Sequence, residues 1–282
     1  MSKIVIPVDF SADSKNTVRY GIMLADHLNK DILLLHSIHI DFPSYGQMGN
    51  VGVQYQPQDI EVRKENAERE FDRLLDEVYQ MNKANVNIEK ITKTGFFADT
   101  VITLSSRKDT YMILLTGRSR DRSESGFVTD SNSVIIEGAE CPVIVVPPTA
   151  SFEKINRILY ATDFQKEDVD SLKKLSEFAG VFDAQIIALH ISDNPDFSNR
   201  IQEEGFNKMI AEKVGYPLIT VTTMPADKIA TGVENYAHNL DVNLIAILKE
   251  NDNFWKRLFG KSHTKKLILK TDKPVIVFHQ KK

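Results

Sequence analysis

The sequence predicts an α/β protein built from two copies of one doubly wound domain, each with a five-stranded parallel sheet flanked by helices. Short apolar runs alternate with longer amphipathic segments, which is typical of parallel strands joined by helices. The stretch "KIVIPVDFSADS" from Lys3 also has a counterpart, "RILYATDFQKED", from Arg157. An apolar strand followed by Asp-Phe therefore occurs twice, which indicates a duplication.

The repeat keeps a constant register along the start of each half. Asp9 and Asp163 are 154 positions apart, and the same offset relates His36 in "LLLLH" to His190 in "IIALH". Nearer the end of each half, "CPVIVV" matches "KPVIVF" at an offset of 132, so the second half is shorter by 22 residues. We assign this difference to residues 41–60, rich in Gly, Gln, Tyr and Pro, as an insertion or long loop.

The individual elements follow from the positions of the apolar runs. In the first half, strands are expected at Lys3–Val8, Asp31–Ser37, Asn87–Thr92, Tyr111–Thr116 and Pro142–Val146, with helices near residues 14–29, 58–84, 97–108 and 131–138. In the second half, strands are expected at Arg157–Thr162, Gln185–Ile191, Leu218–Thr222, Leu244–Leu248 and Val275–Phe278. Two prolines in the linker "PPTASFEKIN" stop the preceding strand, which predicts domains at residues 1–148 and 154–282.

Composition narrows the class of protein. A length of 282 residues suits about two domains, and a net charge of -4 without a face dominated by Lys or Arg argues against a nucleic acid partner. The start "MSKIVIPVDF" has no secretory leader and the apolar runs are too short to cross a bilayer, so we expect a cytoplasmic protein without membrane contact. The single cysteine, Cys141, excludes an internal disulfide and a cysteine metal cluster, and is expected to be buried.

Several segments together resemble the universal stress protein family. They are an opening strand that ends in "PVDFS", a second that ends in "LLHS", a fourth that runs into Gly117, and the closing "AECPVIVVPP". The second half, with "YATDF", "ALHIS" and "FGKSHTKKLILKTDKPVIVF", resembles a second copy, so the chain resembles a tandem member. The resemblance implies an adenine nucleotide alpha hydrolase-like fold. In the nucleotide-binding branch it also implies an ATP site at the carboxyl ends of the strands.

That branch of the family carries Gly-x2-Gly-x9-Gly followed by Ser or Thr after the fourth strand. Glycines let backbone N–H groups approach phosphates, and the following helix N-terminus attracts negative charge. The first half keeps Gly117 and Ser131, but Arg120 and Asp130 replace the second and third glycines. In the second half Lys249 replaces the first glycine. What remains there is Ser262 and Thr264, which could cap a helix or bind one anionic group.

The resemblance also implies roles for residues at the first two strand ends. Asp9 and Asp163 occupy the position that contacts the bound nucleoside, and Ser37 and Ile191 the position beside the adenine. An Asp after a strand could equally cap the following helix. The candidate nucleotide-binding residues are Pro7, Val8, Asp9, Ser37, Gly117, Arg118, Arg120, Ser131, Asn132, Ser133, Asp163, Ile191, Ser262 and Thr264.

Two function classes remain open. The chain could be a stress-response module that binds ATP with Mg, or a related ligand, with the first half favoured because it keeps more of the glycine signature. Alternatively, it could be a structural or protein-interaction module whose ligand loop has decayed. No nucleophile, acid–base pair or metal-ligand set occurs at a recognisable spacing, so no catalytic or metal residue is assigned and we expect no enzyme.

The expected partners are an adenine nucleotide and an unidentified protein. In the family, single-domain members dimerise through the fifth strand in antiparallel fashion. We therefore expect this chain to pair its own two fifth strands as an internal pseudo-dimer, with further assembly into a homo-oligomer left open.

Overall fold

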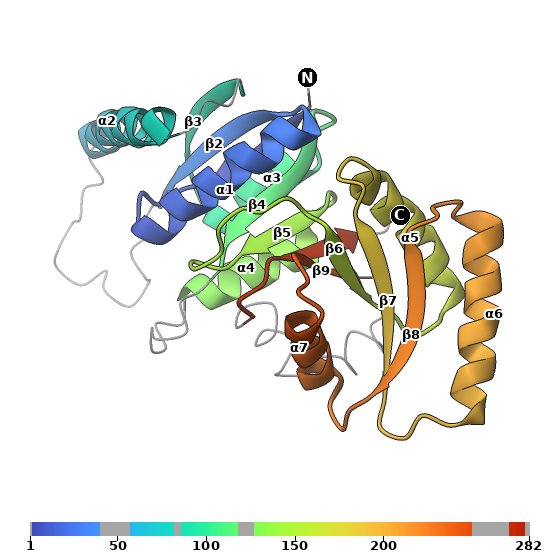
Figure 1. The fold of residues 1–282 in the computed structure, drawn as a ribbon. Coiled ribbons are helices and arrows are strands. Elements are labelled where there is room, and N and C mark those ends of the chain that lie inside the picture. The colour runs from blue at the N-terminus through green and yellow to red at the C-terminus, as the bar shows by residue number, and fades with distance from the viewer. Residues whose placement is uncertain (1, 40–56, 82–85, 118–126, 250–270, 280–282) are drawn as a thin grey trace, which may run out of the picture.

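The computed structural model describes residues 2–39, 57–81, 86–117, 127–249 and 271–279 (Figure 1). The first half contains β1 (Lys3–Pro7), α1 (Ala12–Leu28), β2 (Asp31–Ile38), α2 (Pro57–Met81), β3 (Ile88–Thr94), α3 (Phe97–Ser105), β4 (Thr110–Thr116), α4 (Phe127–Gly138) and β5 (Val143–Val146). The second half contains β6 (Arg157–Ala161), α5 (Lys166–Gly180), β7 (Gln185–Ser192), α6 (Phe197–Lys213), β8 (Ile219–Pro225), α7 (Ile229–Asn239), β9 (Leu244–Lys249) and β10 (Val275–His279).

The ten strands of the described ranges belong to one sheet, in the order β3-β2-β1-β4-β5-β10-β9-β6-β7-β8. Within each half every pair is parallel, and only β5 and β10, at the centre, run antiparallel. The predicted α/β class, with a parallel sheet in each half, is thus confirmed. So is the predicted pairing of the two fifth strands, and Figure 1 shows the two halves extending in opposite directions from this seam.

The seam between the halves is entirely apolar. Val275, Ile276 and Val277 of β10 lie opposite Val145, Ile144 and Val143 of β5. None of these six side chains is more than 1% exposed. The centre of the sheet is therefore a part of the hydrophobic core to which both halves contribute.

Two hydrophobic cores cover the two faces of the sheet. Alternation along β1 shows the division, because Ile4 and Ile6 point into one core and Val5 into the other. The first core receives buried side chains from α1, α2, α5 and α6, and the second from α3, α4 and α7. Strands buried on both faces are the reason that the sequence shows nearly continuous apolar runs.

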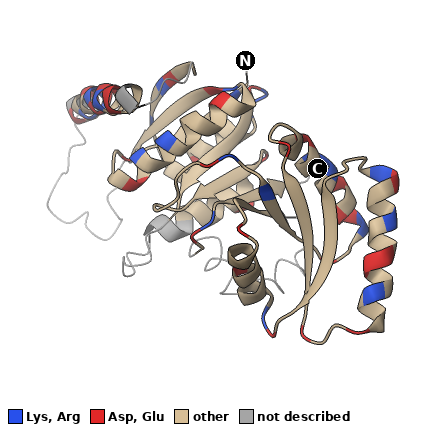
Figure 2. Cartoon of the chain, in the orientation of Figure 1, with Lys and Arg blue, Asp and Glu red and all other residues tan. Residues whose placement is uncertain are grey.

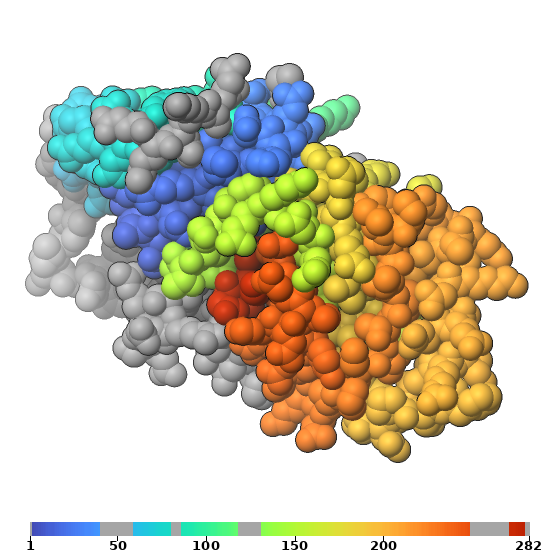
Figure 3. Space-filling model, viewed as in Figure 1, coloured from blue at the N-terminus to red at the C-terminus, as the bar shows by residue number. Residues whose placement is uncertain are grey.

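The linker between the halves lies against α1. The Asn16 side chain donates hydrogen bonds to the carbonyls of Pro148, at 3.0 Å, and Ala150, at 2.8 Å. The Phe152 ring packs edge-on against Tyr20, with ring centroids 5.2 Å apart. In Figure 3 the linker, in yellow-green, runs across the boundary between the halves. The linker is therefore anchored on α1 of the first half.

Several predicted boundaries are wrong. Residues 57–60 form the first turn of α2 and not an insertion, and residues 40–56 lie outside the described part. Helix α2 has 25 residues where α6 has 17, so part of the length difference is a longer helix. Exposed pairs such as Glu70 and Arg73, 2.6 Å apart, support helix α2. Figure 2 shows both signs of charge along α2 and α6.

Cys141 lies just before β5 and is buried, as predicted. Burial raises the pKa of its thiol to about 12, so the thiol is protonated at neutral pH. None of the described helices has an apolar stretch long enough to cross a bilayer. In the same described ranges, His, Cys, Asp and Glu side chains do not gather in threes or more at a place that could hold a metal ion.

Candidate functional site

The first strand of each half ends in the same backbone turn, which we call the Asp-Phe turn (residues 9–11 and 163–165). The phenylalanine has a positive φ in both, 62° at Phe10 and 58° at Phe164. Its ring contacts the histidine at the end of the second strand, with centroid distances of 4.8 Å to His36 and 4.6 Å to His190. Bulky residues rarely adopt this conformation, so its presence in both halves indicates that the packing maintains it.

The two histidines hold these turns in place. In each half the ring donates a hydrogen bond from Nδ1 to the carbonyl of the residue before the Asp, at 2.9 Å in the first half and 3.0 Å in the second. His190 is only 8% exposed, and His36 is half-buried. His190 thus lies buried near the end of β7.

In the first half, the Asp itself caps the turn. The Asp9 carboxylate accepts hydrogen bonds from the Ser11 backbone N–H, at 3.0 Å, and from the Ser11 hydroxyl, at 2.6 Å. Ser11 is in turn the N-cap of α1 and accepts from the Ser14 backbone N–H. Partial burial raises the pKa of Asp9, but the bonds from Ser11 outweigh it and hold the pKa below its usual value.

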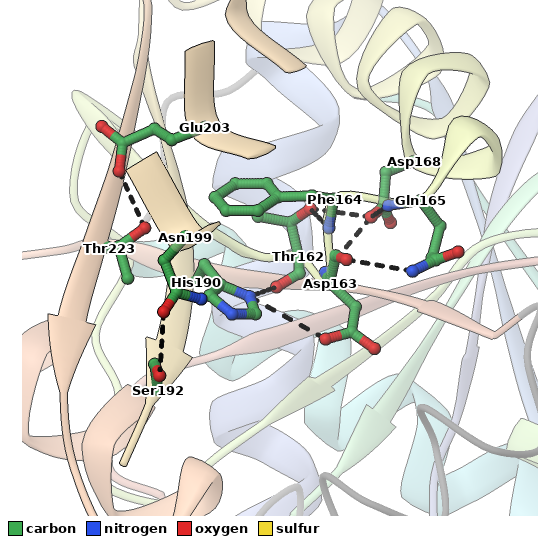
Figure 4. Close-up of polar contacts among 10 residues, drawn as sticks. All are labelled: Thr162, Asp163, Phe164, Gln165, Asp168, His190, Ser192, Asn199, Glu203 and Thr223. Carbon is green, nitrogen blue, oxygen red and sulfur yellow. Dashed lines mark hydrogen bonds and ion pairs between the residues drawn. The ribbon is translucent and has the colours of Figure 1, made fainter. Parts of the chain in front are cut away.

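In the second half, another carboxylate takes this place (Figure 4). Asp168, only 5% exposed, accepts from the Tyr160 hydroxyl at 2.6 Å and the Thr162 hydroxyl at 2.7 Å. It also accepts from the backbone N–H groups of Asp163, at 3.2 Å, and Gln165, at 3.0 Å. Burial raises the pKa of Asp168 above its usual value, although these hydrogen bonds act in the opposite direction.

The Asp163 side chain extends away from Asp168 and lies beside the His190 ring (Figure 4). Its Oδ1 atom is 3.8 Å from His190 Nδ1. Both side chains line a cleft of about 420 Å³, which we call the second-half cleft. This volume lies within the range of small-molecule sites. The lining residues are Asp163, Gln165, His190, Ile191, Ser192, Asp193, Asn199, Gln202, Ala226, Asp227 and Ile229.

The composition of the second-half cleft determines which ligand groups it can accept. Its described lining carries three carboxylates, from Asp163, Asp193 and Asp227, and neither Lys nor Arg. Carboxylates accept hydrogen bonds from hydroxyl and amino groups, but they repel phosphate unless a cation lies between. Ile191, Ala226 and Ile229 also line the cleft, but Ile191 is only 5% exposed. The cleft therefore suits a ligand part that is rich in hydrogen-bond donors and carries no negative charge.

The first half has a smaller cleft with different chemistry. It has a volume of about 300 Å³ and is lined by Phe10, His36, Ser37, Ile38, His39, Arg63, Asn66, Ala67 and Glu70. Asp9 is not part of this lining, so the two positions singled out at the strand ends, Asp9 and Ser37, do not share this cleft. The Ser37 hydroxyl instead donates to the Gly95 carbonyl at 3.4 Å.

Two residues of the predicted phosphate loop have packing roles in the structure. A Cβ on Gly117 would lie 3.0 Å from the Val146 carbonyl oxygen, to which the Gly117 N–H donates at 2.7 Å. The close approach of β5 is therefore a reason for glycine here that needs no phosphate. Asn132 is 4% exposed, and its side chain donates to the Thr116 carbonyl at 3.0 Å. Asn132 thus holds the end of β4.

The predicted start of the fourth helix at residue 131 is wrong, because α4 begins at Phe127. Only the first four N–H groups of a helix lack partners within it, so those of Ser131 and Ser133 lie beyond the anion-binding end. Both side chains are half-buried. Pro7 and Val8 are buried at the end of β1, and the Val8 N–H donates to Leu35. The other candidates lie outside the described residues; they are Arg118, Arg120, Ser262 and Thr264.

Sequence reasoning missed Asp168, Asp193 and Asp227. Asp168 had only a partial signal, because an acidic residue three positions after a helix N-cap is one half of the capping-box pattern, and the Gln165 N–H does donate to Asp168. Asp193 and Asp227 follow β7 and β8 in short loops. Their position in the cleft depends on how the strand ends are placed, which no local pattern indicates.

The two capping carboxylates are expected to affect stability with opposite signs as pH changes. The pKa of Asp9 is lowered on folding, so its contribution is present above the ordinary value of 3.8 and lost as pH falls. The pKa of Asp168 is raised, so the folded protein keeps this proton longer than the unfolded chain. The free energy of unfolding then falls as pH rises from 3.8 through the folded pKa.

Urea unfolding of the wild type, Asp9→Asn and Asp168→Asn between pH 3.5 and 7 tests this expectation. The stability advantage of the wild type over Asp9→Asn should grow with pH, and its advantage over Asp168→Asn should shrink. Parallel pH curves for all three proteins would show that neither carboxylate changes its pKa on folding.

Comparison with known proteins agrees with the duplicated architecture. The sequence profile of the universal stress protein family matches residues 1–147 and again residues 154–279. A search of curated proteins returned no match. A universal stress protein from Archaeoglobus fulgidus DSM 4304 has a similar structure, with a TM-score of 0.69 at 17% identity, over 99% of this chain and 96% of that one. A putative universal stress protein from Pseudomonas aeruginosa UCBPP-PA14 gives 0.58 at 13%, over 99% and 92%.

Proposed function

Because the chain belongs to the universal stress protein family, with a family domain in each half, we propose that it is a stress-response module whose second half binds the nucleoside part of an adenine nucleotide. The role is one of binding and not of catalysis. The observation that carries the proposal is that Asp163 and Ile191 line one cleft. These are the two second-half positions at which the family resemblance implies nucleoside and adenine contacts.

The chemistry of the second-half cleft supports a nucleoside. Ribose hydroxyls are donors that the Asp163 carboxylate can accept, and charge-assisted bonds of this kind are stronger than neutral ones. Ile191, only 5% exposed, lies in the wall beside which the base would sit, and Ser192 and Gln202 are further polar groups in the lining. The three carboxylates of the described lining disfavour phosphate, so bound ATP would need Mg or groups outside this lining to compensate its charge.

This proposal moves the expected site from the first half to the second. The preference for the first half rested on "PVDFS", Gly117 and Ser131. The close approach of β5 explains a glycine at position 117, and Ser131 lies inside α4 and not at its start. Asp9, moreover, accepts hydrogen bonds within its own turn. The features that favoured the first half therefore support folding more directly than ligand binding.

Calorimetric titration of the full chain with adenosine, AMP and Mg-ATP tests the proposal. Asp163→Ala is expected to weaken adenosine binding by about tenfold or more, because a hydrogen bond to a charged group contributes about 1.5–3 kcal/mol. Asp9→Ala is the matched control at the same position of the first half, and it should leave the affinity unchanged.

Binding that survives Asp163→Ala but is lost in Asp9→Ala would assign the ligand to the first half and refute the proposal. If none of the three ligands binds the wild type, the alternative of a protein-interaction module with a decayed ligand loop gains support.

A further inference from the structure

We propose that Asp168 is a positioning residue that determines which half binds the ligand. It takes over the capping of the Asp-Phe turn and thereby leaves the Asp163 carboxylate directed at the second-half cleft. The inference rests on the proposed function, because it concerns the same cleft. It adds that the different directions of the Asp9 and Asp163 carboxylates arise at a residue outside the lining of that cleft.

The first half shows what the turn does without this residue. The position that corresponds to Asp168, five residues after the Asp, is Ser14. Its hydroxyl donates to the Ser11 carbonyl at 3.1 Å. The Ser11 N–H goes to the Asp9 carboxylate instead, and the Ser11 hydroxyl joins it on the same oxygen, Oδ1. Asp9 is therefore directed toward its own turn.

In the second half the same backbone N–H has a different acceptor. Gln165 corresponds to Ser11, and its N–H donates to Asp168 Oδ2 and not to Asp163. The Asp163 N–H also donates to Oδ2, so the turn is closed from the side of α5. Asp163 Oδ1 then lies beside His190, at the edge of the cleft. Figure 4 shows the Asp163 and Asp168 carboxylates on different sides of the turn.

Two neighbouring differences between the halves accompany Asp168. Tyr160 and Thr162 donate hydroxyl hydrogen bonds to its carboxylate, and the corresponding first-half residues are Ile6 and Val8, which have no side-chain donor. A buried carboxylate is costly unless several donors satisfy it. The second half supplies four such donors, and the first half has neither the buried carboxylate nor the two hydroxyls. The three positions thus form one unit that is present in the second half only.

A comparison of two ligands separates positioning from mere stability. We measure the affinities of the full chain for adenosine and for 2′,3′-dideoxyadenosine, which lacks the hydroxyls that Asp163 would bind. The wild type should prefer adenosine by about tenfold or more. Asp168→Ser gives the second half the serine of the first half. It should weaken adenosine binding by about tenfold and bring the preference close to one, because Asp163 turns onto the Gln165 N–H.

Asp168→Asn is the matched control, since its amide oxygen can still accept from both backbone N–H groups. Its preference for adenosine should stay within about threefold of that of the wild type. If Asp168→Ser does not fold, Asp168→Glu replaces it. The added methylene displaces the acceptor from the turn, and the preference should again fall.

Three results would overturn the inference. A folded Asp168→Ser protein that keeps the wild-type preference, while Asp163→Ala loses it, would leave the proposed function intact and remove the role of Asp168. An equal loss of affinity for both nucleosides, with the preference unchanged, would show that Asp168 acts on stability alone. A wild type that binds neither nucleoside would overturn the proposed function together with this inference.

Discussion

Ile276→Asp is expected to destabilise the whole chain by on the order of 5 kcal/mol or more, which is comparable to the total stability of many domains. Ile276 is fully buried in β10 and lies opposite Ile144 of β5. The substitution removes core packing, which alone costs about 2–5 kcal/mol, and buries a carboxylate in an apolar seam. Because both halves contribute to this seam, both should lose stability.

Thermal and urea unfolding, followed by circular dichroism, measures this effect. Ile201→Asp is the control, because Ile201 is 55% exposed on α6 and its replacement should change the free energy of unfolding by about 0.5 kcal/mol or less. Wild-type stability in Ile276→Asp would show that the two halves do not share a core at β5 and β10. Unfolding of the second half alone, with the first half intact, would show that they fold independently.

Residues 1–148 expressed alone are expected to form a dimer or larger aggregates. In the full chain β10 covers the edge of β5, and the four residues of β5 are buried on both faces. Removal of the second half exposes an uncharged, apolar edge strand, which is a template for pairing with another strand. Because β5 and β10 are corresponding strands that pair antiparallel, we expect β5 of a second copy to take the place of β10.

Sedimentation velocity at tens of micromolar, a concentration at which micromolar affinities can be detected, distinguishes a monomer from a dimer or larger aggregates. The full chain, in which the edge is covered, is the control. A stable, folded monomer of residues 1–148 would mean that the edge of β5 needs no partner. The pairing of β5 with β10 would then result only from the linker that tethers the two halves.

The fold could be predicted because its signals are local and repeated. Strands buried on both faces give apolar runs such as "ILLL" and "VIVV", and the duplicated Asp-Phe turns fix the register between the halves. The pairing of β5 with β10 followed from the antiparallel fifth-strand dimer that the family resemblance implies, together with the need to cover two apolar edges. Boundaries were less predictable. The extended start of α4 and the first turn of α2 contain Thr, Asp, Pro and Gln, which suit loops as well as helix starts.

The candidate site was predicted only in part, for a physical reason. Asp9 and Asp163 are equivalent in sequence and in backbone, yet their carboxylates serve different purposes. The difference comes from the residue five positions later, Ser14 in one half and Asp168 in the other. A backbone N–H in such a turn has several possible acceptors, and only the arrangement of the side chains decides which one it bonds. The glycine signature, by contrast, favoured the first half, although the close approach of β5 explains Gly117 there without a ligand.

In the proposed function the second-half cleft holds a nucleoside through Asp163. A crystal structure of the full chain grown with adenosine is the most direct test of this site. We expect adenosine in the second-half cleft, with a ribose hydroxyl about 2.5–3.0 Å from the Asp163 carboxylate and the base against Ile191. Asp168 should keep its hydrogen bonds to the turn. Adenosine bound beside Asp9 in the first half, or an Asp163 carboxylate turned onto the Gln165 N–H with the nucleoside bound elsewhere, would refute the proposed site.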